Sequence, residues 1–283
     1  MAIAVRSSGM SLRLGSHLFT PGPRTLVMGI VNNTPDSFYD GGAHYGVEAA
    51  AAHGRTLLAD GADVLDIGGQ TGQIGMEIAV ETEIERVVPI IERLVDACVS
   101  VDTYRSAVAA AALAAGASFV NDYTGGFDPD LAGVVADAGA GAGLVVTHYR
   151  GRPRSNPSRS YDGSVDEVLR ELEAKVAHAT DAGVSSDRIL VDPGFGFGKS
   201  TRLDLILLRD LERVKSLGFP VLVACSHKEF TADATGAAEH DLTPTIAAAV
   251  LASRAGAAMV RLHDVAECRP AIALADAVRN VGA

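Results

Sequence analysis

Short apolar runs alternate with longer Ala-rich stretches along most of the chain. The apolar runs carry no polar alternation, which is typical of strands buried on both faces. They are Leu26–Val31, Val64–Ile67, Val99–Val101, Ser118–Val120, Gly143–Thr147, Ile189–Val191, Val221–Ala224 and Ala258–Leu262. Helices are expected near residues 47–60, 79–95, 104–115, 130–138, 164–182, 202–216, 241–255 and 267–280. Strands and helices in strict alternation predict a closed (β/α)8 TIM barrel rather than an open doubly wound sheet.

The segment before the first apolar run has a different pattern. Residues 11–20 alternate around Gly15-Ser16, which predicts a short β-hairpin that caps the bottom of the barrel. The barrel itself should extend over about residues 25–280. No linker or low-complexity segment interrupts the chain, so residues 1–283 are expected to form a single domain. The Gly-, Pro-, Arg- and Ser-rich piece Arg150–Gly163 is interpreted as the loop after the fifth strand.

Composition narrows the functional classes. The 283 residues are 48% hydrophobic, which suits one large barrel core. The formal net charge of −11, with no basic tract, argues against nucleic-acid binding and against an anionic membrane surface as partner. The 3 cysteines are widely spaced and form no CxxC pair, which indicates reduced thiols in a cytoplasmic protein. Neither a signal peptide nor a membrane span is expected from the apolar runs.

Polar residues follow nearly every predicted strand. They are Asn32, Asp66, Asp102, Asn121, Asp122, His148, Asp192, the triplet Ser226-His227-Lys228, Arg261 and His263. A single polar residue at such a place is usually a cap or a turn residue. In a barrel, however, the carboxyl ends of all strands face one pocket, so these residues are expected to converge there.

The strongest of these signals is the stretch from Ile189 to Ser200. An apolar run ends in Asp192, and Pro193, three glycines, two phenylalanines and Lys199 follow. The glycines let the backbone approach a ligand closely. From the residues alone, two interpretations stay open: Asp192 binds a ligand, or it only caps a helix or pairs with a lysine such as Lys228.

The polar residues also indicate a kind of ligand. Asp102, Asn121 and Asp192 offer acceptors suited to the paired N–H donors of a 2-amino-4-oxo heterocycle, and Lys228 could donate to its ring. Arg261 and His263 lie two apart on the last strand and share a face, where barrels commonly bind phosphate. With Asn32 as an oxygen ligand to Mg²⁺, they would form a diphosphate site. No zinc spacing, Walker loop, dinucleotide fingerprint or Ser/His/Asp order is visible.

Taken together, the motifs resemble those of dihydropteroate synthases. Residues 28–42 (MGIVNNTPDSFYDGG) are similar to the first signature of that family and residues 66–69 to the second. The segments 100–103, 121–122, 192–199, 226–228 and 261–264 follow in the family's order, so the likeness runs from about residue 12 to 280. The resemblance implies a barrel that joins 6-hydroxymethyl-7,8-dihydropterin diphosphate to p-aminobenzoate in folate biosynthesis, with Mg²⁺ and as a homodimer.

The resemblance also implies a role for each matching residue. The residues that would bind the pterin are Asp102, Asn121, Asp192 and Lys228. The residues that would bind the diphosphate and Mg²⁺ are Asn32, Arg261 and His263. Phe197 and Ser226 would border the second substrate, with Gln73 and His227 beside them, and Lys199 would lie where the two pockets meet. Catalysis is then electrostatic: Asp102 and Asp192 favour the pterin cation while Lys228 helps to hold the ring, and Mg²⁺, Arg261 and His263 stabilise the leaving diphosphate.

The chain departs from the family pattern around the second substrate. The second loop has Gly72, Gln73 and Ile74 where the family has Thr, Arg and Pro, and His227 replaces an arginine. Thr147 stands where a methionine is expected. A neutral glutamine does not replace the charge and forked donors of a guanidinium. Either these loops have drifted without consequence, or the second substrate is changed or lost.

Three hypotheses remain at this point. The chain is a working dihydropteroate synthase, a paralogous pterin transferase or hydrolase with another acceptor, or a non-catalytic pterin-binding homologue. A barrel that binds methyltetrahydrofolate for methyl transfer would not need Asn32, Arg261 and His263 for a diphosphate.

Overall fold

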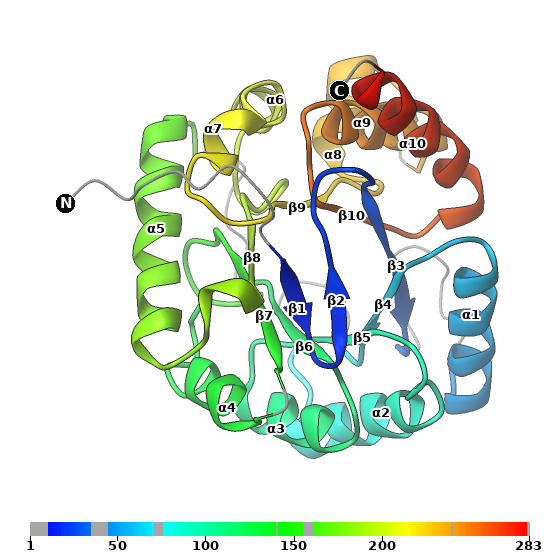
Figure 1. Cartoon of the computed structure of the whole chain (residues 1–283), viewed down its shortest axis with the longest axis vertical. Coiled ribbons are helices and arrows are strands. Elements are labelled where there is room, and N and C mark those ends of the chain that lie inside the picture. Colours follow the sequence, from blue (N-terminus) through cyan, green and yellow to red (C-terminus); the bar gives the residue numbers. More distant parts are fainter. Residues whose placement is uncertain are drawn as a thin grey trace.

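The chain folds into a ring of eight parallel strands surrounded by helices (Figure 1). The computed structural model describes residues 11–34, 45–70, 76–139, 141–154, 161–238 and 240–281. The strands of the ring are β3 (Leu26–Asn32), β4 (Val64–Gly68), β5 (Val99–Asp102), β6 (Phe119–Asp122), β7 (Gly143–Thr147), β8 (Ile189–Asp192), β9 (Leu222–Ala224) and β10 (Met259–Leu262). They are hydrogen-bonded in the order β8-β7-β6-β5-β4-β3-β10-β9. A single parallel bridge between Val191 and Val221 joins the two ends, so the predicted (β/α)8 TIM barrel is confirmed.

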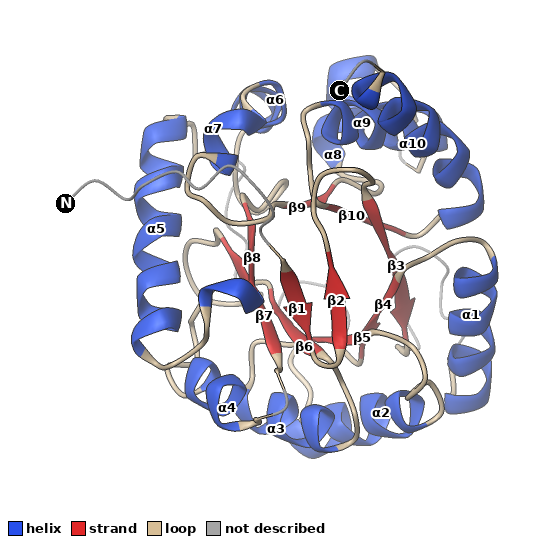
Figure 2. Ribbon diagram, viewed as in Figure 1, coloured by secondary structure: helices blue, strands red, loops and turns tan. Residues whose placement is uncertain are grey.

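Helices follow the strands and pack around the outside of the ring (Figure 2). They are α1 (Val47–Ala59), α2 (Val80–Glu92), α3 (Ser106–Ala114), α4 (Leu131–Asp137), α5 (Val165–Asp181), α6 (Thr201–Arg209), α7 (Leu211–Lys215), α8 (Glu229–Thr235), α9 (Leu242–Arg254) and α10 (Val265–Asn280), with a 3₁₀ turn at Ser186–Arg188. The outward-facing strand residues, such as Val27, Ile67 and Val191, pack against them in the larger core. This burial on both faces explains why the strands read as continuous apolar runs.

The N-terminal hairpin closes one end of the barrel. Strands β1 (Leu12–Leu14) and β2 (His17–Phe19) pair antiparallel, and Gly15 takes the positive φ of 61° that the turn requires. Leu12 and Leu14 are fully buried against the lowest inward residues of the strands, including Met28 and Phe119. Figure 1 shows the hairpin lying across the ring of strands. The predicted hairpin is therefore present, and it covers the end of the barrel opposite the strands' carboxyl ends.

Two helical features differ from the sequence prediction. The helix expected at 202–216 is divided at Asp210, whose φ of −100° and ψ of 29° end α6 before α7 begins. Helix α8 was not predicted, because its sequence EFTADAT is too short and polar to show a helical apolar stripe. This short helix begins directly after Lys228 and therefore sets the backbone of the seventh loop.

The three cysteines, Cys98, Cys225 and Cys268, are buried and carry free thiols. Burial raises the pKa of each thiol to about 12, which keeps it protonated and unreactive. Across the described ranges of the chain, no helix has both the length and the apolarity that crossing a membrane requires.

Candidate functional site

The inside of the barrel is built in layers, because every second residue of a strand points inward. The lowest layer is apolar and includes Val64, Phe119, Leu190 and Met259. Two residues further along each strand the inward side chains become polar. This middle layer contains Asp66, Ser100, Asn121, Asp192 and Arg261. One step higher, at the mouth, the same alternation places Asn32, Asp102, Tyr123, Tyr149, Ser226 and His263.

Asp66 is the centre of the middle layer; the sequence analysis expected it at the pocket but assigned it no role in binding or catalysis. Its carboxylate is completely buried and accepts hydrogen bonds from Ser100 Oγ, from Asn121 Nδ2 at 2.8 Å and from Arg261 Nε at 2.6 Å. A buried carboxylate is tolerated only when it is paired in this way. The sequence signal for its inward position was the alternation of inward and outward side chains along a strand, since Val64 and Asp66 must face the same side of β4.

Arg261 links the middle layer to the mouth. Its Nη2 donates to Asp102 Oδ2 at 2.7 Å, so one guanidinium bridges the carboxylates of β4 and β5. Burial raises the pKa of Asp102, and the charge of Arg261 opposes that rise. Arg261 and Asp102 keep exposed fractions of 17% and 23%, so both side chains remain accessible to a ligand from the mouth.

Asp192 stands at the end of β8 with only 3% of its surface exposed. Its Oδ1 accepts the Gly194 N–H at 2.6 Å. Burial raises the pKa of Asp192 to about 6, although this hydrogen bond and the charges of Lys228, Lys199 and Arg261 all lower it. A carboxylate with so few fixed partners among the described residues can accept N–H donors from a ligand.

The glycine loop after Asp192 is held in place from several sides. Gly194 has φ 72°, and a Cβ there would overlap the carbonyl oxygen of His148. The Gly196 N–H donates to Asp204 Oδ2 at 3.0 Å, and the ammonium of Lys199 donates to the carbonyl oxygens of Gly194 and His148 at 2.7 and 3.2 Å. These contacts fix the position of Asp192 relative to the neighbouring strand.

Lys199 therefore has a different place from the one expected. Its side chain is completely buried beneath the glycine loop and does not lie at the boundary of two pockets. The carbonyl oxygens of Gly194 and His148 hold it there, because a buried ammonium must have its donors satisfied.

Lys228 reaches the site from the opposite side of the same loop. Its ammonium lies 4.5 Å from the ring centroid of Phe197, and its Cδ lies close beside Gly196, where a larger residue would interfere. Among the described residues no ion pair joins Lys228 to Asp192, although their charges interact. The plain structural pair left open by the sequence is thus not formed, and Lys228 keeps donors for a ligand.

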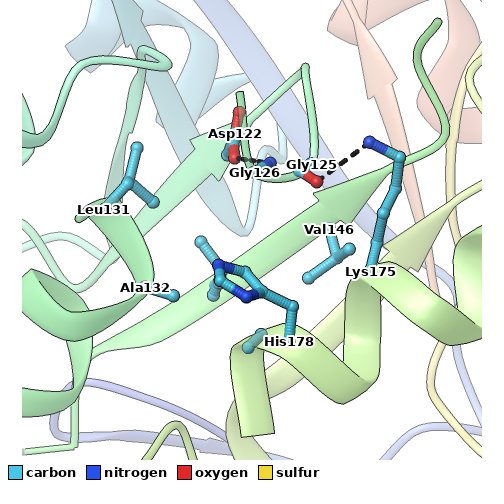
Figure 3. Close-up of a pocket in the computed structure, with 10 residues that line it drawn as sticks. Asp122, Gly125, Gly126, Leu131, Ala132, Val146, Lys175 and His178 are labelled. Atoms are coloured by element: carbon cyan, nitrogen blue, oxygen red, sulfur yellow. Dashed lines mark hydrogen bonds between the residues drawn. The ribbon is translucent and has the colours of Figure 1, made fainter. Parts of the chain in front are cut away.

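Two polar residues expected at the mouth point elsewhere. His148 is 1% exposed and its Nε2 lies 3.1 Å from Glu171 of α5, because residue 148 shares the outward face of Leu144 and Val146. Asp122 accepts hydrogen bonds from Thr124 and from the Gly126 N–H at 2.7 Å and so shapes the loop after β6 (Figure 3). The expected convergence of polar residues from every strand was therefore wrong for these two positions.

The cavity drawn in Figure 3 lies beside Asp122 on the outside of the barrel. Residues such as Leu144, Lys175 and His178 line it, and Lys175 Nζ donates to the carbonyl oxygens of Thr124 and Gly125. Its volume of about 10 Å³ has room for a single water molecule. It is a packing gap between helices and strands and cannot hold a substrate.

The residues of the seventh and eighth strand ends form a chain of polar contacts. Ser226 Oγ lies 2.9 Å from His263 Nδ1 and accepts the His263 backbone N–H at 3.2 Å. Burial and the charge of Arg261 lower the pKa of His263 to about 3, so its imidazole is neutral at pH 7. It can therefore offer a phosphate one hydrogen bond but no charge.

His227 is turned away from the barrel axis. Its backbone has φ 49°, and its Nε2 lies 2.6 Å from Asp264 Oδ2 with only 3% of the side chain exposed. Its predicted place beside the second substrate stays a prediction, and Gln73, together with Gly72 and Ile74, lies outside the described residues.

An aromatic cluster at the mouth was missed by the sequence analysis. The Tyr123 and Phe197 rings stack at 6.0 Å and 29°, and Tyr149 meets Phe197 edge-on at 5.3 Å. Tyr123 and Tyr149 follow Asn121 and Thr147 by two residues, so the alternation could have revealed them. Aromatic faces of this kind suit a flat ring that enters from the mouth.

Asn32 could contribute to metal binding at the end of β3. Its Oδ1 lies close over Gly68, and no hydrogen bond from another described residue occupies this oxygen. The described part of the chain contains no cluster of three or more His, Cys, Asp or Glu residues that could hold an ion. A single amide oxygen is a suitable ligand for a Mg²⁺ ion that arrives bound to a diphosphate and keeps several water ligands. It is not sufficient for a metal ion that is held by protein ligands alone.

Comparison with known proteins identifies the family of the chain. The family described as Pterin binding enzyme matches residues 28–263. A Mycobacterium leprae protein named inactive dihydropteroate synthase 2 is 43% identical over 268 residues, which are 91% of each chain. The dihydropteroate synthase of Bacillus subtilis is 37% identical over 270 residues, or 92% of this chain and 90% of that protein.

Solved structures give the same result. The Xanthomonas albilineans dihydropteroate synthase with 4-aminobenzoic acid superimposes with a TM-score of 0.87 and 41% identity, covering 96% of this chain and 99% of that one. Sequence motifs, relatives and barrel thus agree, and the chain belongs to the dihydropteroate synthase family of pterin-binding enzymes.

Proposed function

We propose that the protein condenses 6-hydroxymethyl-7,8-dihydropterin diphosphate with p-aminobenzoate and releases diphosphate, as a step of folate biosynthesis. The observation that carries the proposal is the buried carboxylate of Asp192, which faces Lys228 and Arg261 without forming an ion pair with either in the described structure. The two edges of a pterin, with N–H donors on one and acceptors on the other, match such an arrangement of acceptor and cation.

The pterin would lie in the middle layer. Asp192 accepts from its 2-amino group and ring N–H, Asn121 and Asp102 bind its other edge, and Lys228 donates to the ring carbonyl. Of these, Asn121 is held in orientation by its bond to Asp66. The site is thus pre-organised for a flat, hydrogen-bonding ring before the ligand arrives.

The diphosphate would lie at the mouth between β3 and β10. Arg261 supplies the charge, His263 a neutral N–H donor, and Asn32 an oxygen for Mg²⁺, which would neutralise the charge that develops on the leaving group. Arg261 is already tied to Asp66 and Asp102, so these carboxylates position it and spread part of its charge.

In the reaction, the C–O bond between the exocyclic methylene and the diphosphate breaks, and its electron pair stays with the diphosphate. The lone pair of the aryl amine forms the new C–N bond, and the amine loses a proton to water or to the departing diphosphate. Asp102 and Asp192 favour the cationic pterin, while Arg261 favours the anion that leaves. An aryl amine is already neutral at pH 7, so the site needs no strong base.

A second candidate is a homologue that binds the pterin without turning it over, or that uses another acceptor. It is favoured by the 43% identical relative whose name includes the word inactive. The loss of two arginines, at Gln73 and His227, points in the same direction.

One experiment separates the two. The purified protein is given the dihydropterin diphosphate and Mg²⁺, and diphosphate release is followed with and without p-aminobenzoate. Release that depends on p-aminobenzoate supports the synthase, and equal release in its absence indicates a hydrolase. Binding heat without any release indicates the non-catalytic homologue and refutes the synthase.

A further inference from the structure

The loop after β7 carries an arginine, Arg154, with two donor nitrogens that have no hydrogen-bond partner among the described residues. Arg154 is half-buried, and its Nε and Nη1 atoms are buried without a hydrogen-bond partner in the structure described. Two buried donors left without acceptors carry a cost in free energy. Such a cost is offset when a ligand or an ordered water supplies the missing acceptors.

Arg154 lies within electrostatic range of residues at the barrel mouth. Burial raises the pKa of Asp102, of Glu83 and of the Tyr123 hydroxyl, and the positive charge of Arg154 opposes the rise in each of the three. Its guanidinium therefore lies within electrostatic range of groups on β5, α2 and the loop after β6.

The carboxylates around Arg154 already have other partners. Glu83 and Glu77 both pair with Arg105, at 3.0 and 2.8 Å, and Asp102 pairs with Arg261. The charge of Arg154 is therefore not consumed by an ion pair in the described structure. It remains available to an anion that enters the mouth.

The neighbouring aromatic cluster indicates what that anion is attached to. Tyr123, which interacts with Arg154, stacks on Phe197, and Tyr149 contacts both rings at 6.0 and 5.3 Å. The Tyr149 hydroxyl also donates to the Arg152 carbonyl at 3.1 Å, which ties the Arg154 loop to the cluster. Aromatic faces beside a guanidinium form a site for an aryl carboxylate.

We infer that Arg154 binds the carboxylate of the aryl amine acceptor, while the faces of Tyr123, Tyr149 and Phe197 hold its ring. The inference rests on the proposed function and adds the residue that selects the acceptor. Arg154 takes over the role of the guanidinium groups that this chain lacks at Gln73 and His227. A fork of N–H donors from another loop can bind the same planar carboxylate.

The diphosphate is a less suitable partner for Arg154. The groups assigned to the diphosphate, Asn32, Arg261 and His263, stand on or directly after the adjacent strands β3 and β10. Arg154 instead interacts with Asp102 of β5 and Tyr123 after β6. The two anions of the reaction are thus held on different sides of the mouth.

The test compares two acceptors in three variants. Steady-state rates are measured with p-aminobenzoate and with 4-methylaniline, which has the same amine and ring but no carboxylate. Arg154→Gln removes the charge, Arg154→Lys keeps the charge but not the fork, and Arg152→Gln changes an exposed arginine of the same loop as a control. Binding of the dihydropterin diphosphate, measured by calorimetry, shows that each variant is folded.

Arg154→Gln should raise the Michaelis constant for p-aminobenzoate about tenfold or more and leave that for 4-methylaniline within about twofold. Arg154→Lys should be intermediate and Arg152→Gln unchanged. An equal effect on both acceptors, or none on p-aminobenzoate, would overturn the inference while the proposed function stood.

The failure of the proposed function has a separate signature. If the unaltered protein releases no diphosphate with either amine, equilibrium binding is measured instead. The two ligands are then pteroate and an analogue of pteroate in which a methyl group replaces the carboxylate. A preference for pteroate that Arg154→Gln abolishes supports the inference. Equal binding of the two compounds, or a preference that survives in Arg154→Gln, overturns it.

Discussion

Asp66 and Arg261 form an ion pair across the inside of the barrel, with 2.6 Å between Oδ2 and Nε. The carboxylate is fully buried and the guanidinium is 17% exposed, so the pair joins the interior to the mouth. Because Asp66 also accepts from Asn121, one carboxylate orients a candidate pterin ligand and a candidate diphosphate ligand at the same time. Asp66 is thus a positioning residue beneath the site.

Asp66→Asn should destabilise the protein by about 3–5 kcal/mol, because it breaks a buried pair and leaves Arg261 with Asp102 as its remaining carboxylate. Urea unfolding monitored by circular dichroism measures this. Asp210→Asn is a suitable control, since Asp210 pairs with Arg209, which is 71% exposed, and the loss of such a pair should cost less than about 1 kcal/mol. Similar effects for the two variants would contradict the central role of Asp66.

Binding of the pterin should depend on pH through Asp192. Its pKa of about 6 means that the empty site holds a proton on this carboxyl below pH 6, whereas pterin N–H groups require the carboxylate. Affinity should therefore increase from pH 5 to pH 7 and then level off. Asp192→Asn should bind about tenfold or more weakly at pH 7 and lose this dependence, as measured by calorimetry across the range.

The stability of the empty protein should show the opposite trend. A raised folded pKa makes the contribution of Asp192 to stability fully present below the ordinary value of 3.8 and progressively lost as the pH rises through about 6. The loss is on the order of 3 kcal/mol. The difference in unfolding free energy between the protein and Asp192→Asn, followed from pH 4 to pH 7, should change by that amount, and a flat difference would contradict the assignment.

The glycine loop offers a test of how Asp192 is positioned. Gly194→Ala places a methyl group against the His148 carbonyl at a residue with φ 72°. Gly218 has φ 85° with open space around it, so Gly218→Ala reports the backbone cost alone, about 1 kcal/mol. Gly194→Ala should cost clearly more and should weaken pterin binding, whereas Gly218→Ala should leave binding unchanged. Equal costs in urea unfolding would show that the loop can shift freely.

Asn32→Ala tests the proposed metal ligand. Mg²⁺ should increase the affinity for the dihydropterin diphosphate. In Asn32→Ala, which lacks the amide oxygen, this increase should be about tenfold smaller than in the unaltered protein. Binding of the hydroxymethyl dihydropterin, which carries no diphosphate, should not change. Calorimetry with and without Mg²⁺ measures both, and an unchanged effect of Mg²⁺ would remove Asn32 from the site.

The sequence by itself determined the barrel and the strand ends. Strands buried on both faces must be apolar throughout, so the run Ile189–Val191 and its terminal Asp192 were recognisable without coordinates. The alternation within a strand also contained Asp66, Tyr123 and Tyr149, because a period of two fixes which side chains share a face. Helix α8 was hidden, since a short polar helix has no periodic apolar stripe.

Only the tertiary structure decided which of these groups meet. Arg261 contacts Asp66 and Asp102 across 195 and 159 residues of sequence, and closure of the barrel alone brings them together. Outward-facing His148 and buried Lys199 show that a polar residue near a strand end can serve the scaffold instead of the pocket. The position of Arg154 depends on the path of its loop. No local sequence pattern predicts that path, because it depends on contacts with distant strands.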